Sequence, residues 1–125
     1  MPTPQLSEQG TRFNLAAERR ELRASPELAQ EGHTARTLVR TDDLRVVLVV
    51  MKEGGRMADH FARATACVQV LEGAVRLGIG EREVAVMPGE LFVMAAGLRH
   101  AVFADRDSAF LLTLVWSPNA TRDRG

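Results

Sequence analysis

Two of the three histidines of this chain stand at spacings that could bring their imidazoles to one site. His60 follows Gly54 after five residues, and His100 lies three residues after Gly97. An imidazole can ligate a divalent transition metal, and near neutral pH it can also give or take a proton. Two imidazoles alone hold such a metal weakly, because sites that keep an open position generally use three protein ligands. The pair therefore predicts either a weak site for Zn, Ni, Fe or Mn or the polar contacts of a metal-free pocket, and a tightly held catalytic metal has the least support.

Other reactive side chains lack partners that would make them catalytic. Cys67 has no activating neighbour and is expected to be a small buried hydrophobe. His33 is expected to be a surface residue or a packing residue. Ser108 follows Asp105 and Asp107, but nothing places these residues beside a histidine, so a polar turn is favoured over a catalytic triad. The catalytic residues are unknown from the sequence alone.

Composition and charge exclude several classes of partner. Sixteen Lys and Arg residues balance sixteen Asp and Glu residues, so the basic excess of a nucleic-acid-binding protein is missing. The longest apolar run, Leu44 to Met51, contains Arg45 and is far shorter than the ~18 residues of a membrane span. The start of the sequence has no signal-peptide pattern, and a single cysteine excludes an intrachain disulfide. We expect a cytoplasmic protein with no nucleic-acid and no membrane partner.

The elements that must position the histidines follow from helix caps and turn residues. Residues 1–12 are expected to be a flexible lead-in, and residues 13–31 a helical segment. In this segment Asn14 caps a helix that ends near Arg23, and Ser25 with Pro26 opens a short second turn. Runs rich in β-branched residues follow, separated by turn signals. Strands are expected at Thr34–Arg40, Leu44–Met51, Thr65–Leu71, Ala74–Ile79, Arg82–Met87, Leu91–Met94, Arg99–Ala104 and Ala109–Trp116.

Three tight turns connect these strands in the region from 72 to 90. Glu72–Gly73 and Gly80–Glu81 suit hairpins, and Met87-Pro88-Gly89-Glu90 suits a type II turn. Many short strands joined in this way predict an all-β sandwich or barrel over residues 32–117, with a flexible tail at 118–125.

The glycines and histidines resemble the first motif of the cupin superfamily, Gly-x5-His-x-His-x3–4-Glu-x6-Gly. Gly54, His60 and Gly73 match this pattern. Ala62 stands at the second histidine position, and Ala66 stands at the glutamate position.

The second cupin motif is Gly-x5-Pro-x-Gly-x2-His-x3-Asn. Gly89, Gly97 and His100 match it, whereas Ala95 replaces the proline and Ala104 the asparagine. The resemblance covers about residues 35 to 115. It implies an all-β cupin jelly-roll β-barrel with a short N-terminal helical segment.

A complete cupin centre uses three imidazoles and a carboxylate, and this chain retains two of the imidazoles. Ala66 and Val68 share one face of a regular strand and Cys67 the other, so Cys67 faces away from the histidines if the glutamate position faces inward. Asp59 also faces away unless a bulge re-aims it. The resemblance therefore implies a roomy, mostly apolar interior, a typical setting for a small ligand. Its expected lining is His60, Ala62, Ala66, Val68, Met94 and His100.

Three functions are compatible with these residues. The leading hypothesis is a single-domain cupin that binds a small organic molecule in the barrel, with His60 and His100 as polar contacts and at most a weak metal site. The first alternative is a metal-dependent enzyme of the dioxygenase or isomerase type with an incomplete protein ligand set. The second is a packed dimeric structural module.

A homodimer is expected in each case. Leu44–Met51 and Ala109–Trp116 are apolar on both faces, so the N-terminal helix or a second subunit must cover them. Small cupins commonly pair through sheet faces, and Trp116 is the predicted anchor.

Overall fold

The computed structural model of the protein describes residues 9–60 and 63–117, without the side chains of residues 59 and 60. In this part of the chain two helices precede nine strands. The helices are α1 (Leu15–Arg23) and α2 (Pro26–Glu31). The strands are β1 (His33–Arg40), β2 (Leu44–Met51), β3 (Arg56–His60), β4 (Thr65–Glu72), β5 (Val75–Ile79), β6 (Arg82–Val86), β7 (Leu91–Met94), β8 (His100–Ala104) and β9 (Ser108–Val115).

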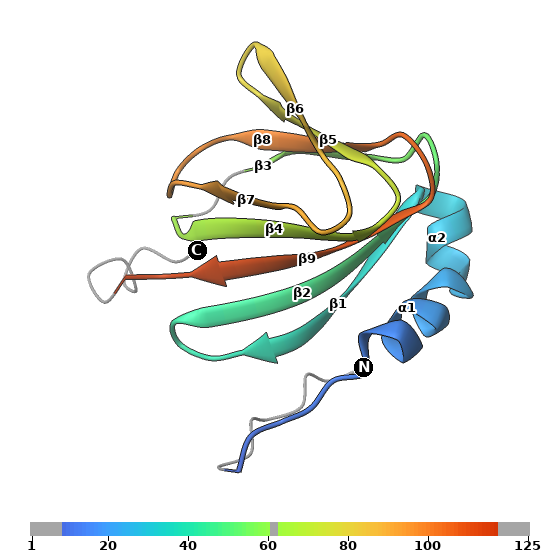
Figure 1. Ribbon diagram of the computed structural model, residues 1–125, viewed down its shortest axis with the longest axis horizontal. Coiled ribbons are helices and arrows are strands. Elements are labelled where there is room, and N and C mark those ends of the chain that lie inside the picture. The colour runs from blue at the N-terminus through green and yellow to red at the C-terminus, as the bar shows by residue number, and fades with distance from the viewer. Residues whose placement is uncertain (1–8, 61–62, 118–125) are drawn as a thin grey trace.

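The strands form two antiparallel sheets that face each other (Figure 1). Sheet A has the order β1-β2-β9-β4-β7, and sheet B has the order β3-β8-β5-β6. Both helices lie at one end of the molecule, beside β1 and β2 (Figure 1). The expected all-β jelly-roll fold with a short N-terminal helical segment is confirmed. No helix in the described residues has the length and apolar character needed to cross a membrane.

The first helix begins and ends where its sequence predicts. The Asn14 side chain accepts a hydrogen bond from the Ala17 amide at 3.0 Å, which satisfies one of the N–H groups that a helix start leaves unpaired. Glu18 in the first turn and Arg23 in the last turn have the charges that the helix dipole favours.

The predicted turns are also present. Gly73, Gly80 and Gly89 all have positive φ. The Glu90 amide donates to the Met87 carbonyl at 2.9 Å, which closes the expected four-residue turn.

Strand β3 was missed by sequence reasoning, although it carries His60. It follows two glycines, and Arg56 and Asp59 break its apolar pattern, so it has neither the alternation nor the β-branched content of its neighbours. It exists because it pairs with β8 along one edge of sheet B.

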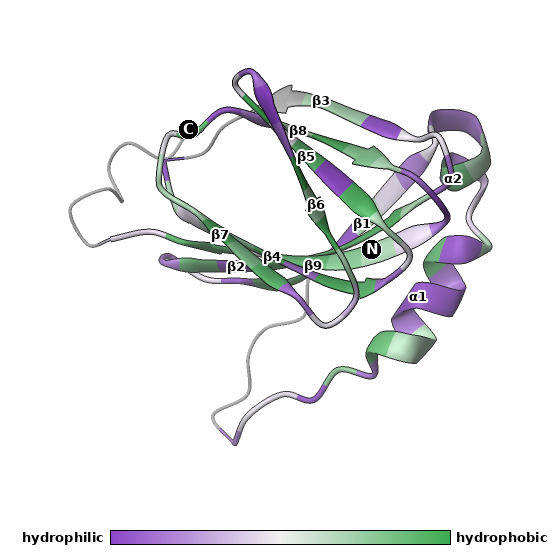
Figure 2. Ribbon diagram, turned by 45° about the horizontal axis from the view of Figure 1, so that its top comes forward, coloured by the Kyte–Doolittle hydropathy of each residue, from purple (hydrophilic) through white to green (hydrophobic). Residues whose placement is uncertain are grey.

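The hydrophobic core has two parts because sheet A is apolar on both faces. One part fills the space between the two sheets. The other lies outside sheet A, where Leu22 and Leu28 of the helices pack with Leu48 and Val50 of β2. Hydrophobic residues run along β2, β4 and β9, whereas α1 contains both hydrophilic and hydrophobic residues (Figure 2). The expectation that the N-terminal helix covers part of this face is confirmed.

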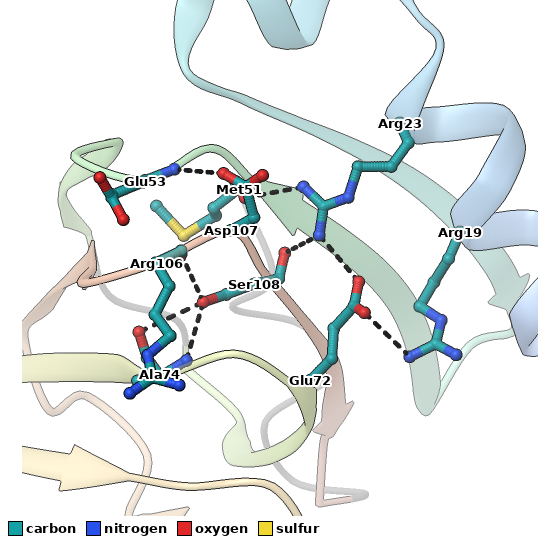
Figure 3. A network of polar contacts seen from close by, with 9 residues as sticks. All are labelled: Arg19, Arg23, Met51, Glu53, Glu72, Ala74, Arg106, Asp107 and Ser108. Carbon is teal, nitrogen blue, oxygen red and sulfur yellow. Dashed lines mark hydrogen bonds and ion pairs between the residues drawn. The ribbon is translucent and has the colours of Figure 1, made fainter.

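Arg23 fastens α1 to the barrel (Figure 3). Its Nη1 donates to the Met51 carbonyl at 2.9 Å, and its Nη2 donates to the Ser108 carbonyl at 3.1 Å and to Glu72 Oε1 at 2.8 Å. One guanidinium thereby joins the helix to the ends of β2 and β4 and to the start of β9. Planar guanidinium donors suit this multiple contact.

Candidate functional site

Strands β3 and β8 bring the backbones of the two motif histidines together. Met57 lies opposite Val102, and after an irregularity in register His60 lies opposite His100. Cross-strand partners in an antiparallel pair are nearest neighbours on a sheet, with Cβ atoms usually about 5 Å apart. Residues forty positions apart in the sequence are therefore adjacent in the fold. The irregularity between residues 57 and 60 is of the kind that re-aims side chains, which is why strand parity alone could not place residue 59.

The His100 side chain faces the barrel interior. It is 5% exposed and lies on the same face of β8 as Val102 and Ala104, which belong to the core between the sheets. Its Nδ1 lies 3.2 Å from the carbonyl oxygen of Leu98. A carbonyl oxygen only accepts, so Nδ1 is the donor in this contact. Metal-ligating histidines are commonly oriented by an outer contact of this kind.

The expected pocket walls are buried in the same core. Ala66, Val68 and Met94 are each less than 5% exposed, and Ala66 lies opposite Met94 across β4 and β7. Cys67 is half-buried on the other face of β4, and Gln69 is exposed there. The predicted parity of this strand is therefore correct.

Ala62 lies outside the described residues, as does the side chain of His60. For these two positions the pocket assignment stays a prediction.

The described donors do not fit the four-ligand metal centre that the cupin motifs imply. The glutamate position holds the methyl group of Ala66, and the core cluster to which it belongs consists of hydrophobic side chains. No three His, Cys, Asp or Glu side chains come together among those that the structure describes. The described ligand to a metal in the barrel would be His100, with His60 as the second candidate from the sequence.

Ser108 has a structural role. It is fully buried, its Oγ accepts from the Ala74 amide at 3.0 Å, and its hydroxyl proton reaches the Arg106 carbonyl at 2.8 Å (Figure 3). Asp107 accepts from the Glu53 amide at 2.8 Å. These contacts fix the turn before β9, as expected, and no catalytic triad forms from them.

Two arginines that lie away from the barrel interior have raised pKa values. The hydrogen bond to Glu18 raises the pKa of Arg36, and the hydrogen bond to Asp105 raises the pKa of Arg76. Both guanidinium groups therefore stay charged at any physiological pH, and neither ion pair acts as a pH switch.

Comparisons with known proteins identify the family and the fold. The cupin domain family model matches residues 47–116, more than half of the chain. A conserved protein of unknown function from Streptococcus pyogenes is 26% identical, with a TM-score of 0.72 over 94% of this chain and 96% of that one. No curated protein matches the sequence.

Two further structures share the fold at lower identity. KdgF from Halomonas sp. is 20% identical, with a TM-score of 0.62 over 77% of this chain and 86% of that one. Salicylate 1,2-dioxygenase from Pseudoaminobacter salicylatoxidans is 18% identical, with a TM-score of 0.73 over 82% of this chain and 32% of that one. The antiparallel jelly roll, the two motifs and the family match together show that this chain belongs to the cupin family.

Proposed function

We propose that this cupin binds a small organic molecule inside its barrel, with His60 and His100 as the polar contacts. The observation that supports this most strongly is the register of β3 and β8, in which His60 is the cross-strand partner of a buried, inward-facing His100. Directly opposed residues share one face of a sheet, so both imidazoles are proposed to serve one site.

The surroundings of His100 favour a ligand with an apolar body and one polar group. The inward side chains of β4 and β7 are all hydrophobic, and they include the predicted lining residues Ala66, Val68 and Met94. Small-molecule sites commonly combine apolar walls with a few fixed polar groups. The His100 imidazole would form a hydrogen bond with a hydroxyl or carboxylic acid of the ligand, and the alanines at the two missing ligand positions would leave room for the molecule's body.

A metal-dependent enzyme is the second candidate. The Nδ1 contact of His100 with the Leu98 carbonyl is the kind of outer contact that orients metal-ligating histidines. His60 and His100 would hold the ion, and Zn, Ni, Fe or Mn are the candidates because imidazole suits them. A bound metal would polarise a substrate oxygen. Salicylate 1,2-dioxygenase shares the fold with this chain, and at 18% identity that likeness extends to the fold alone.

The test combines metal content with ligand-induced stability. Protein purified without a histidine tag is expected to hold well under one equivalent of metal. Its melting temperature should rise with some members of a panel of small aromatic and aliphatic carboxylates; a ligand at one hundred times its dissociation constant adds about 2.7 kcal/mol. The double variant His60→Ala/His100→Ala should lose this response, whereas His33→Ala should keep it.

Other outcomes would reject the binding proposal in favour of a stated alternative. Near-stoichiometric metal that disappears in the double variant would support the enzyme. No metal and no ligand response in the wild-type protein would leave the packed dimeric structural module.

A further inference from the structure

The outer face of sheet B carries a second set of residues that the barrel chemistry does not use. On β5 and β8 the inward positions Leu77 and Val102 pair with each other, and the next pair along is Gly78 with Ala101 on the opposite face. His100 and Ala101 are neighbours on β8, so they lie on opposite sides of the same sheet.

A hollow of about 590 Å³ lies on this outer face. Its lining comes from β3, β5, β6, β8 and the residues that adjoin them, and consists of Arg56, Gly78, Gly80, Glu81, Arg82, Glu83, Arg99, Ala101 and Phe103. The volume is within the range of small-molecule sites.

The hollow has a flat floor beside an aromatic wall. Gly78 is half-buried and has no side chain, whereas Ala101 beside it is only 3% exposed, so the floor consists mainly of the Gly78 backbone. A Cβ at Gly78 would lie 3.2 Å from Cε2 of Phe103, which places the ring against this glycine. The guanidinium carbon of Arg56 lies 5.5 Å from the ring centroid. The ring and the charge beside it are therefore held next to the floor.

The charges around the hollow are unevenly paired. Arg76 binds both carboxylate oxygens of Asp105 through Nε, at 3.0 and 2.9 Å, and its Nη1 binds Glu83 at 2.7 Å. The Glu83 carboxylate is therefore already paired with Arg76. Arg56 and Arg82 line the hollow and are exposed, and neither forms an ion pair with a carboxylate that the structure describes.

We propose that this hollow binds a small organic anion, with a flat apolar body on Gly78 beside Phe103 and a carboxylate or phosphate group on Arg56. Three strand spacings, about 14 Å, separate β3 from β6, so one oxyanion does not bridge Arg56 and Arg82 at backbone height. Arg56, whose guanidinium lies beside the Phe103 ring, is the proposed direct partner, and Arg82 and Arg99, which also line the hollow, contribute through their charge. This site is distinct from the barrel interior and does not depend on the proposed function.

The experiment is a titration of the ¹⁵N-labelled full chain, followed by amide chemical shifts. Benzoate and phenyl phosphate supply a ring with an oxyanion, inorganic phosphate supplies the oxyanion alone, and benzamide supplies the ring alone. We expect the first two probes to shift the amides of Gly78, Gly80 and Ala101, with tighter binding than inorganic phosphate or benzamide. The relative strength of the two ring probes distinguishes a carboxylate ligand from a phosphate ligand.

Matched arginine variants test the assignment. Arg56→Gln should weaken binding about tenfold, because a charge-assisted contact is lost, and Arg82→Gln should weaken it less. Arg40→Gln, at an exposed position of β1, should leave it unchanged. Arg56→Lys should retain part of the affinity, which separates the loss of charge from a displaced Phe103 ring.

The proposal is overturned if no probe shifts these amides, or if Arg56→Gln and Arg40→Gln have the same effect. It is also overturned if the ring probes shift only the amides of His100 and Met94, since that would place the anion in the barrel. Binding in the hollow requires no ligand in the barrel, so a failure of the barrel proposal does not affect this test.

Discussion

At the scale of single residues, Gly73 connects β4 to β5 and packs closely against the start of β9. Gly73 has φ +86°, and a Cβ there would lie 2.3 Å from both the Asp107 carbonyl oxygen and Ser108 Oγ. Gly89 has the same φ of +86° with no atom within 4 Å of its Cβ position. Substitutions at these two glycines therefore distinguish the cost of backbone strain from the cost of steric overlap.

Gly73→Ala is predicted to lower the free energy of unfolding by about 3 kcal/mol or more, because strain and overpacking add. Gly89→Ala, which has the strain alone, should lower it by about 1 kcal/mol. Urea denaturation of both variants measures the difference, and equal losses would contradict the close packing of Gly73 against Ser108.

The sequence was informative at this scale where strand parity is regular. Alternation put Ala66 and Cys67 on opposite faces, and the cupin resemblance made the Ala66 face the inner one, as the structure has it. It could not place the residues between Met57 and His60, because a register shift depends on the partner strand and leaves no periodic signal.

At the scale of elements, α1 is joined to the barrel through the three hydrogen bonds of the Arg23 guanidinium. We predict that Arg23→Ala lowers the free energy of unfolding by about 2 kcal/mol, mainly because the carbonyls of Met51 and Ser108 lose a charged donor. The ion pair with Glu72 adds little, since 27% of the Arg23 side chain and 43% of the Glu72 side chain are exposed.

Arg20→Ala is the matched control, on the exposed side of the same helix. It should change stability by less than about 0.5 kcal/mol in the same denaturation experiment. Similar losses in the two variants would mean that helix propensity, and not the contacts of Arg23, determines the effect.

Elements with local signals were predictable. Asn14, Pro26 and the Met87–Glu90 turn fix boundaries by short-range chemistry, and the structure has them where expected. Strand β3 was not predictable, because its five residues form a strand only through pairing with β8.

At the scale of the whole molecule, three exposed apolar side chains lie on the outer face of sheet A. Leu91 is 61% exposed, Val93 53% and Val115 44%. Trp116, the predicted dimer anchor, is only 6% exposed, and Arg45 lies over its ring. Trp116 offers little surface to a partner, so the homodimer prediction now depends on Leu91, Val93 and Val115.

Val93→Glu is predicted to raise the dissociation constant of this dimer at least about tenfold, because two like charges would meet in a symmetric interface. Sedimentation equilibrium measures it, with Arg40→Glu on β1 as the control. A monomeric wild-type protein, or a dimer that Val93→Glu leaves intact, would contradict the prediction.

Two motifs in the right order were sufficient to predict the jelly roll. The hollow on sheet B was not predictable, because Arg56, Gly78 and Phe103 come together only through the pairing of three strands.

The measurement that tests the shared histidine site most directly uses imidazole ¹⁵N signals. The chain has three histidines, so His33 serves as an internal reference. Untagged protein labelled at histidine is titrated with the carboxylate that stabilises it most. We predict that the signals of His60 and His100 shift together with one midpoint while His33 stays constant. A shift of only one of the two rings, or equal shifts of all three, would contradict a single site between β3 and β8.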